Sequence, residues 1–148
     1  DLQCALGIAQ LERIEELLEK REKVASLYNT TLKDLPGILL LGDTSQAKKS
    51  WFVYVILLEN NFSMEQRNQI LMALKERKIG CSNYFPPIHL QPFYAEKFGY
   101  RPGNFPVTES VCERTIALPF HGDLAEEQIS YVANNLKYAL ETNLVSSP

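Results

Sequence analysis

Two histidines and three cysteines are the side chains of this 148-residue sequence best suited to act as nucleophiles or to bind a metal. Cys81 stands eight residues before His89, and a Cys–His pair can generate a reactive thiolate. Cys81 lies in an apolar run, however, where a cysteine typically belongs to the inert core. His89 and His121 alone would make a poor metal site. Neither chemistry is therefore expected, and His121 is interpreted as a residue of a surface turn.

A different signal lies between residues 84 and 94, where four aromatic side chains and one histidine occur within eleven residues. Three prolines in this segment favour a stiff, extended path and argue against a regular element through most of it. Loops of this kind, held beside a scaffold, often carry binding residues. Tyr84, His89 and Tyr94 have polar tips, and we expect them to contact a ligand or a partner; a backbone hydrogen bond is the alternative for His89. Phe85 and Phe93 are expected to fill the core beneath the loop.

The elements that must position this segment predict an α+β fold, with a small, mostly antiparallel sheet covered by helices on one face. Apolar runs bounded by turn residues indicate strands, whereas helical periodicity and two capping boxes, Ser63 with Gln66 and Asp123 with Glu126, indicate helices. The expected helices cover residues 1–34, 63–78, 106–114 and 123–141, and the expected strands cover residues 37–41, 51–58, 79–84 and 115–118. Residues 1–148 have the length of a single domain.

The first helix is long and unusually apolar at its beginning. Residues 1–34 contain no proline, and a helix of that length would span about 50 Å, more than the roughly 40 Å diameter of a compact chain of this size. The first eleven residues leave almost no polar face, as in a helix buried on all sides. We therefore expect residues 1–35 to link this domain to a larger domain or to a second subunit; folding back on its own core is the alternative. Left uncovered, the patch around Leu2, Leu6 and Ile8 is expected to drive self-association.

Composition excludes several classes of protein. A net charge of -3 with 15 basic residues argues against a nucleic-acid partner, because phosphate contacts need clustered lysine and arginine. The longest apolar run, residues 52–58, is too short to cross a membrane. Three widely spaced cysteines without a C-x-x-C pair indicate a reducing, cytoplasmic setting and no structural zinc. The sequence contains no G-x-G-x-x-G, P-loop or G-x-S-x-G motif.

Two motifs nevertheless resemble a known family. Residues 2–11 read LQCALGIAQL and residues 84–94 read YFPPIHLQPFY. They are similar to the "QAALGLAQL" and "HYPPLHLQPAY" segments of DegT/StrS-type sugar aminotransferases, and residues 98–100, 105–106 and 118–119 follow in the same order. The resemblance covers essentially the whole chain. It implies the C-terminal small domain of a fold-type-I enzyme that depends on pyridoxal phosphate (PLP), and a homodimer with active sites at the subunit interface. Such enzymes usually transfer an amino group from glutamate to a nucleotide-linked keto sugar.

The resemblance also implies roles for individual residues. Tyr84, His89 and Tyr94 would face the nucleotide-sugar side of the cleft and orient the substrate. Asn83 stands where many members have histidine, which leaves any contact from that position in doubt. The cofactor lysine of the family would lie upstream of Asp1, together with the large cofactor domain.

None of the nine lysines present lies in apolar surroundings that would desolvate its amine and make it nucleophilic. We therefore expect no catalytic residue, cofactor site or metal site in this chain, and no transamination by it alone. PLP is expected in the longer parent.

Two alternatives remain open from the sequence. The chain could be a non-catalytic module for binding or oligomerisation, in which the long helix and the aromatic loop only hold partners together. It could also belong to a dehydratase variant of the same family, in which the cofactor lysine is replaced. The residue that would decide between transferase and dehydratase is expected upstream of Asp1.

Overall fold

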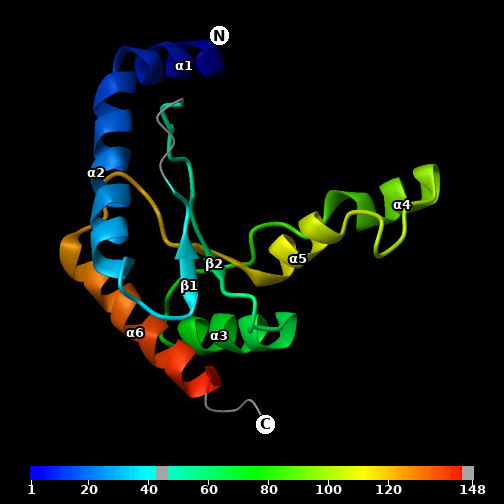
Figure 1. Ribbon diagram of the computed structural model, residues 1–148. Coiled ribbons are helices and arrows are strands. Elements are labelled where there is room, and N and C mark those ends of the chain that lie inside the picture. The colour runs from blue at the N-terminus through cyan, green and yellow to red at the C-terminus, as the bar shows by residue number, and fades with distance from the viewer. Residues whose placement is uncertain (43–46, 145–148) are drawn as a thin grey trace.

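The computed structural model describes residues 1–42 and 47–144, and its elements form the expected α+β domain (Figure 1). A three-stranded antiparallel sheet has the order β1-β2-β3, with Leu39 opposite Leu57 and Ile56 opposite Ile116. In chain order the described elements are α1 (Leu2–Glu12), α2 (Ile14–Leu32), β1 (Ile38–Leu40), β2 (Tyr54–Leu58), α3 (Met64–Glu76), the short 3-10 helix η1 (Ile88–Leu90), α4 (Pro92–Phe98), α5 (Pro106–Arg114), β3 (Thr115–Leu118) and α6 (Glu126–Leu144).

The core lies where α2, α3 and α6 meet the sheet, and it is built from apolar side chains of all these elements. An aromatic stack runs through it, in which the ring of Tyr54 lies 4.6 Å from Tyr28, 5.7 Å from Trp51 and 6.1 Å from Phe120. The polar ends of this stack are satisfied, because the Tyr28 hydroxyl donates to the Pro119 carbonyl at 2.9 Å. Burial also raises the pKa of the Tyr28 phenol.

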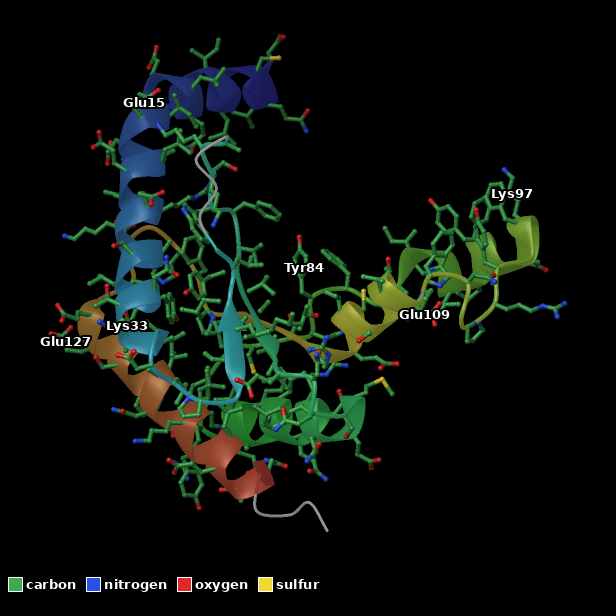
Figure 2. The ribbon with its side chains drawn as sticks, viewed as in Figure 1. Glu15, Lys33, Tyr84, Lys97, Glu109 and Glu127 are labelled. Atoms are coloured by element: carbon green, nitrogen blue, oxygen red, sulfur yellow. The ribbon has the colours of Figure 1, made fainter. Side chains whose placement is uncertain are left out.

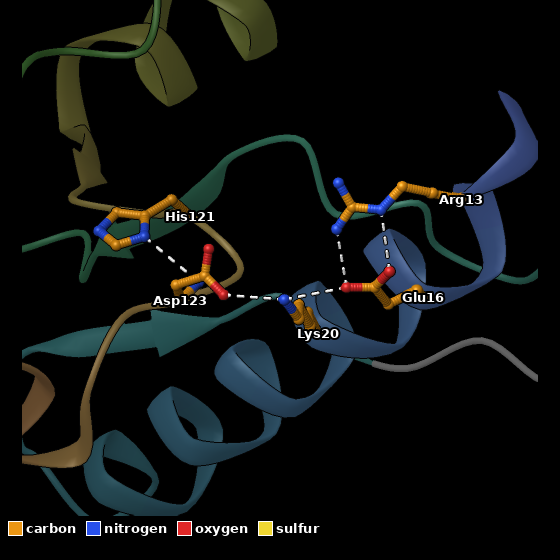
Figure 3. A network of polar contacts seen from close by, with 5 residues as sticks. All are labelled: Arg13, Glu16, Lys20, His121 and Asp123. Atoms are coloured by element: carbon orange, nitrogen blue, oxygen red, sulfur yellow. Dashed lines mark hydrogen bonds and ion pairs between the residues drawn. The ribbon is translucent and has the colours of Figure 1, made fainter. Parts of the chain in front are cut away.

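The prediction of one helix over residues 1–34 is wrong, because the helix breaks at Arg13. There the backbone leaves helical geometry (φ -109°, ψ 11°), and α1 turns away from the axis of α2 (Figure 1). The Arg13 guanidinium makes two hydrogen bonds to the carboxylate of Glu16, at 2.9 and 3.0 Å. Lys20 then joins Glu16 to Asp123, each at 3.1 Å, and so ties the start of α2 to the loop before α6 (Figure 3). The contacts that hold this bend are thus polar, and the contact between Lys20 and Asp123 joins residues far apart along the chain.

Local capping was predicted correctly at one helix and wrongly at another. Ser63 and Gln66 form the expected capping box of α3, with bonds of 2.9 and 3.2 Å. Asp123 does not cap α6, because α6 begins three residues later than expected and the Asp123 carboxylate pairs with Lys20 instead. At that helix start the side chain of Gln128 accepts the N–H of Ala125 at 2.9 Å.

The segment after α3 also departs from the prediction. Residues 79–84 form no strand, and only an isolated bridge joins Ser82 to Ala117 of β3. The proline-rich segment does contain regular structure, because Pro92 occupies the first turn of α4, where its missing N–H costs nothing. Together with η1 and the following loop, α4 forms a projection that we call the aromatic arm (residues 85–105), which extends away from the sheet beyond α5 (Figure 1).

Candidate functional site

A cavity of about 730 Å³ lies between the aromatic arm and α5, and it contains all three side chains that the sequence singled out, Tyr84, His89 and Tyr94. Figure 2 shows Tyr84 near the base of α5 and Lys97 at the far end of the arm. The other lining residues come from the arm, from α5 and from the start of β3: Phe85, Pro86, Pro87, Ile88, Phe98, Tyr100, Phe105, Thr108, Val111, Cys112 and Thr115. Sequence reasoning thus identified one side of the cavity, whereas the α5 side was missed.

The lining of this cavity is aromatic and uncharged. Among the lining residues in the described parts of the chain there is no lysine, arginine, aspartate or glutamate. Aromatic faces of this kind accommodate planar or apolar groups by stacking and by edge-to-face contact. An anionic group such as a phosphate would find no counter-charge inside the cavity.

The two tyrosines differ in burial but both have hydroxyls that could reach a ligand. Tyr84 is half-buried, and its ring meets Phe85 edge-to-face at 4.9 Å. Tyr94 is 37% exposed, and its ring stacks on Phe98 at 6.2 Å. Neither hydroxyl has a hydrogen-bond partner among the described residues. Each can therefore donate to, or accept from, a group that enters the cavity.

His89 is the most buried of the three, with 8% of its surface exposed. Its Nε2 lies 2.9 Å from Oε1 of Glu109, so its partner is a carboxylate side chain and not the backbone group considered as the alternative. Backbone N–H groups of Gly103 and Phe105 lower the pKa of the Glu109 carboxyl, Gly103 most strongly, with His89 as a further cause. An ionised carboxylate only accepts, so Nε2 of His89 must carry a hydrogen.

Two phenylalanines were predicted to fill the core, and this prediction is wrong. Phe85 is 64% exposed and Phe93 is 62% exposed, because the arm projects from the domain and does not fold back onto it. Phe85 has a left-handed backbone (φ 53°), which is unusual for a bulky residue and turns the chain into the arm. These rings therefore belong to an exposed aromatic surface.

The remaining candidates, Cys81 and His121, lie outside this cavity. Cys81 is 8% exposed, and burial raises the pKa of its thiol, as for an inert core cysteine. His121 lies in a turn, where its Nδ1 accepts the N–H of Asp123 at 3.3 Å, and it lines a separate cavity of about 420 Å³.

In the described parts of the chain, no group of three or more histidine, cysteine, aspartate or glutamate side chains could hold a metal. No described helix is long and apolar enough to cross a bilayer.

Glu109 is the functional candidate that the sequence analysis overlooked. It lies on α5, twenty residues beyond His89, and accepts hydrogen bonds from three separate residues. The only signal in the sequence was His89 itself, because a histidine that becomes buried needs a polar partner. The sequence contained several acidic residues at similar distances, so only the structure could select this one.

All nine lysines lie at the surface. Seven are exposed, while Lys20 and Lys49 are half-buried. Lys20 is paired with Glu16 and Asp123, which raises its pKa, and Lys49 donates to the carbonyls of Leu41 and Gly42. A lysine that condenses with a carbonyl cofactor needs a desolvated, readily deprotonated amine. None of these side chains has that environment.

Comparison with known proteins gives consistent matches. The sequence model of the DegT/DnrJ/EryC1/StrS aminotransferase family matches residues 1–137. The spore coat polysaccharide biosynthesis protein SpsC of Bacillus subtilis is 32% identical over 133 residues, which are 89% of this chain and 34% of SpsC.

Two solved structures have a similar fold over nearly the whole chain. Spr1654 from Streptococcus pneumoniae, in its PMP form, aligns with a TM-score of 0.87 and 28% identity, covering 95% of this chain and 35% of that one. PseC of Helicobacter pylori, an aminotransferase involved in the biosynthesis of pseudoaminic acid, aligns with a TM-score of 0.85 and 29% identity, covering 95% and 37%. The chain therefore spans about a third of the length of the proteins that it matches.

Proposed function

Because this chain belongs to the DegT/DnrJ/EryC1/StrS aminotransferase family, we propose that it is the C-terminal small domain of a longer, PLP-dependent sugar aminotransferase. In this proposal the longer enzyme transfers an amino group from glutamate to a nucleotide-linked keto sugar. This domain supplies the wall of the active site that meets the sugar nucleotide. The observation that carries the proposal is the family match over residues 1–137, which includes the aromatic arm and its cavity.

The accessible surface of the chain supports a missing large domain. The chain exposes 10140 Å², whereas a compact monomer of 16.9 kDa would expose about 7,700 Å². The excess of about 2,400 Å² is larger than the roughly 800 Å² that each partner buries in a standard interface. Much of the exposed apolar surface lies on α1, where Leu2 is 86% and Leu6 is 63% exposed. We propose that the large domain and a second subunit cover it, with α1 as the link.

The residues of this chain do not fit PLP by themselves. PLP supplies an electron sink once it is bound to a lysine, and that lysine must be desolvated. The nine lysines described above are exposed or half-buried. Lys20 is held as a surface cation by Glu16 and Asp123, and Lys49 donates to backbone carbonyls. We therefore assign the cofactor to the rest of the polypeptide, and derive no chemical step from this chain.

The chemistry of the cavity supports a role in substrate binding. The hydroxyls of Tyr84 and Tyr94 are available for hydrogen bonds, and His89 contributes as part of the wall. Aromatic rings stack on planar groups and on the apolar faces of sugars. Since no cation lines the cavity, we propose that the diphosphate of the substrate is neutralised by residues of the large domain. A role in sugar biosynthesis agrees with the names of SpsC and PseC.

We also propose a cytoplasmic location. Cys4, Cys81 and Cys112 are all free thiols in the structure. An exposed thiol such as Cys4 persists in a reducing compartment, whereas oxidising compartments favour disulfides.

The decisive experiment uses the polypeptide encoded by the whole reading frame. We expect it to transfer isotope-labelled nitrogen from glutamate to a dTDP- or UDP-linked keto sugar in the presence of PLP, as measured by mass spectrometry. Tyr84→Phe and Tyr94→Phe should each raise the KM for the sugar nucleotide about tenfold, the cost of one lost hydrogen bond, and leave the KM for glutamate unchanged. Tyr138→Phe on α6, an exposed tyrosine outside the cavity, is the matched control.

The alternatives give different results in the same assay. Loss of water from the sugar without amino transfer would identify a dehydratase. Failure to take up PLP at all would favour the binding or oligomerisation module. For this chain alone, incubation with PLP and then borohydride should label no single lysine stoichiometrically in a mass spectrum, and a single fully labelled lysine would overturn the division into domains.

A further inference from the structure

The aromatic arm joins the rest of the domain through a small polar junction. Its helix α4 packs against η1, while large side chains on both, including Ile88, Phe93 and Phe98, remain more than half exposed. An element with so little buried apolar surface is not fixed by the hydrophobic core. The contacts at its base must therefore determine where it lies.

A single carboxylate organises this junction. Oε1 of Glu109 accepts from Nε2 of His89 at 2.9 Å and from the N–H of Phe105 at 3.1 Å. Both carboxylate oxygens accept from the N–H of Gly103, at 2.8 and 3.1 Å. Glu109 lies on α5, His89 on η1, and the two backbone donors on the loop that returns from the arm. The loop of residues 103–105 is adjacent to α5 along the chain, whereas His89 comes from η1, twenty residues before Glu109. These segments thus meet at one side chain, at the position labelled in Figure 2.

The residues that line the cavity come from both sides of this junction. Thr108, Val111 and Cys112 of α5 form one wall, whereas Tyr94, Phe98 and Tyr100 of the arm form the other. The His89 ring also lines the cavity and packs edge-to-face on Phe105, at 4.8 Å between ring centres. A shift of the arm about this point would change the distance between the walls.

We propose that Glu109 and His89 form a clasp that positions the aromatic arm and thereby sets the width of the cavity. Both are positioning residues. His89 acts through the arm, because its Nε2–H is committed to Glu109. The further claim, that the width of the cavity selects the sugar nucleotide, rests on the function proposed above. The clasp itself does not depend on that function.

The direct test measures amide hydrogen exchange in this chain, with no cofactor or substrate present. Glu109→Ala removes the acceptor of the Gly103 and Phe105 amides, and we expect exchange at both to rise roughly tenfold or more, because charge-assisted hydrogen bonds are lost. Exchange in β2 and α6 should not change. Glu113→Ala, the same substitution at an exposed position of the same helix, is the matched control and should leave the arm as it is. Glu109→Gln keeps the size of the side chain and should restore part of the protection.

Coupling between the two residues distinguishes a clasp from two independent contacts. His89→Phe keeps an aromatic ring but removes the donor to Glu109. If the pair acts as a unit, the double variant with Glu109→Gln should exchange no faster at residues 99–105 than the faster single variant. Additive increases, or no increase in either single variant, would overturn the clasp.

A spectroscopic signature tests the position of the arm. In protein labelled with fluorotyrosine, Glu109→Gln should shift or broaden the fluorine NMR signals of Tyr94 and Tyr100, and should leave those of Tyr131 and Tyr138 on α6 unchanged. Unchanged signals from the arm would contradict the proposal.

The consequence for the substrate is tested in the whole enzyme. There, the same variant should raise the KM for the sugar nucleotide severalfold and leave the KM for glutamate unchanged. If the exchange results hold and these KM values do not change, the claim about cavity width is wrong. Amino transfer by the unaltered enzyme tests the proposed function separately.

Discussion

The aromatic arm and the helical core both contain many large apolar side chains, yet they are held in different ways. In the core, Tyr28, Ile56 and Leu136 are fully buried, and the helices pack on one another and on the sheet. In the arm, Phe93 and Phe98 are more than half exposed, and the hydrogen bond between His89 and Glu109 at the base fixes the geometry. Hydrophobic burial is non-directional, whereas hydrogen bonds specify one arrangement. The arm thus keeps its apolar surface available while its position stays defined.

The largest expected effect concerns how much a side chain of the core and one of the arm contribute to the free energy of unfolding. Leu136→Ala in α6 removes a side chain with 0% exposure, and we expect the free energy of unfolding to fall by about 2–5 kcal/mol. Phe98→Ala in the arm should cost less than about 1 kcal/mol, because that ring is already 55% exposed. Chemical denaturation followed through Trp51 measures both. Equal losses would show that the arm belongs to the cooperative core.

The second prediction asks which exposed apolar region drives association. We expect the average mass of this chain in sedimentation to rise with concentration, because α1 presents an uncovered apolar face. Leu6→Glu should return the chain to a monomer. Phe93→Ser, which removes an equally exposed ring from the arm, should have little effect. The opposite pattern would assign association to the arm, and a clean monomer at high concentration would contradict both.

Acid should reduce amide protection in the arm at a pH where the core is still folded. The folded-state pKa of Glu109 is lowered from 4.5, so its contribution to stability is fully present above pH 4.5 and is lost as the pH falls through the lowered value. We expect amide protection at residues 99–105 to decrease in that window while protection in β2 persists. Glu109→Gln should remove this pH dependence from the arm. Simultaneous loss of protection in both regions would show global acid unfolding instead.

The smallest effect concerns the bend between α1 and α2. Hydrogen bonds from Arg13, and next from Lys20, lower the pKa of Glu16 to about 2. An NMR titration should therefore show Glu16 ionised well below pH 4.5, and Arg13→Ala should move its pKa most of the way back. Because all these groups lie at the surface, we expect little change in overall stability. A Glu16 pKa near 4.5 in the unaltered chain would mean that the Arg13 contact is not formed in solution.

Short-range features of this protein could be predicted well. The Ser63–Gln66 capping box, the three strands of the sheet and the helix after Pro106 depend on neighbours a few residues away, and the structure contains all of them. Tyr84, His89 and Tyr94 were expected to contact a ligand or partner because they share one short segment, and all three line the same cavity. Helix α4 was missed because three prolines outweighed the fact that a proline fits the first turn of a helix.

The sequence by itself determined most of the helices, the three strands of the sheet and the gathering of aromatic side chains in residues 84–94, because side-chain type and backbone preference act locally. The tertiary structure decided the bend at Arg13, the partner of His89 and the exposure of Phe85 and Phe93. Each of these depends on residues distant along the chain, as when Lys20 meets Asp123 or His89 meets Glu109. Many acidic residues could have paired with Lys20 or accepted from His89 equally well, so only the packing of the elements selects the pair that forms.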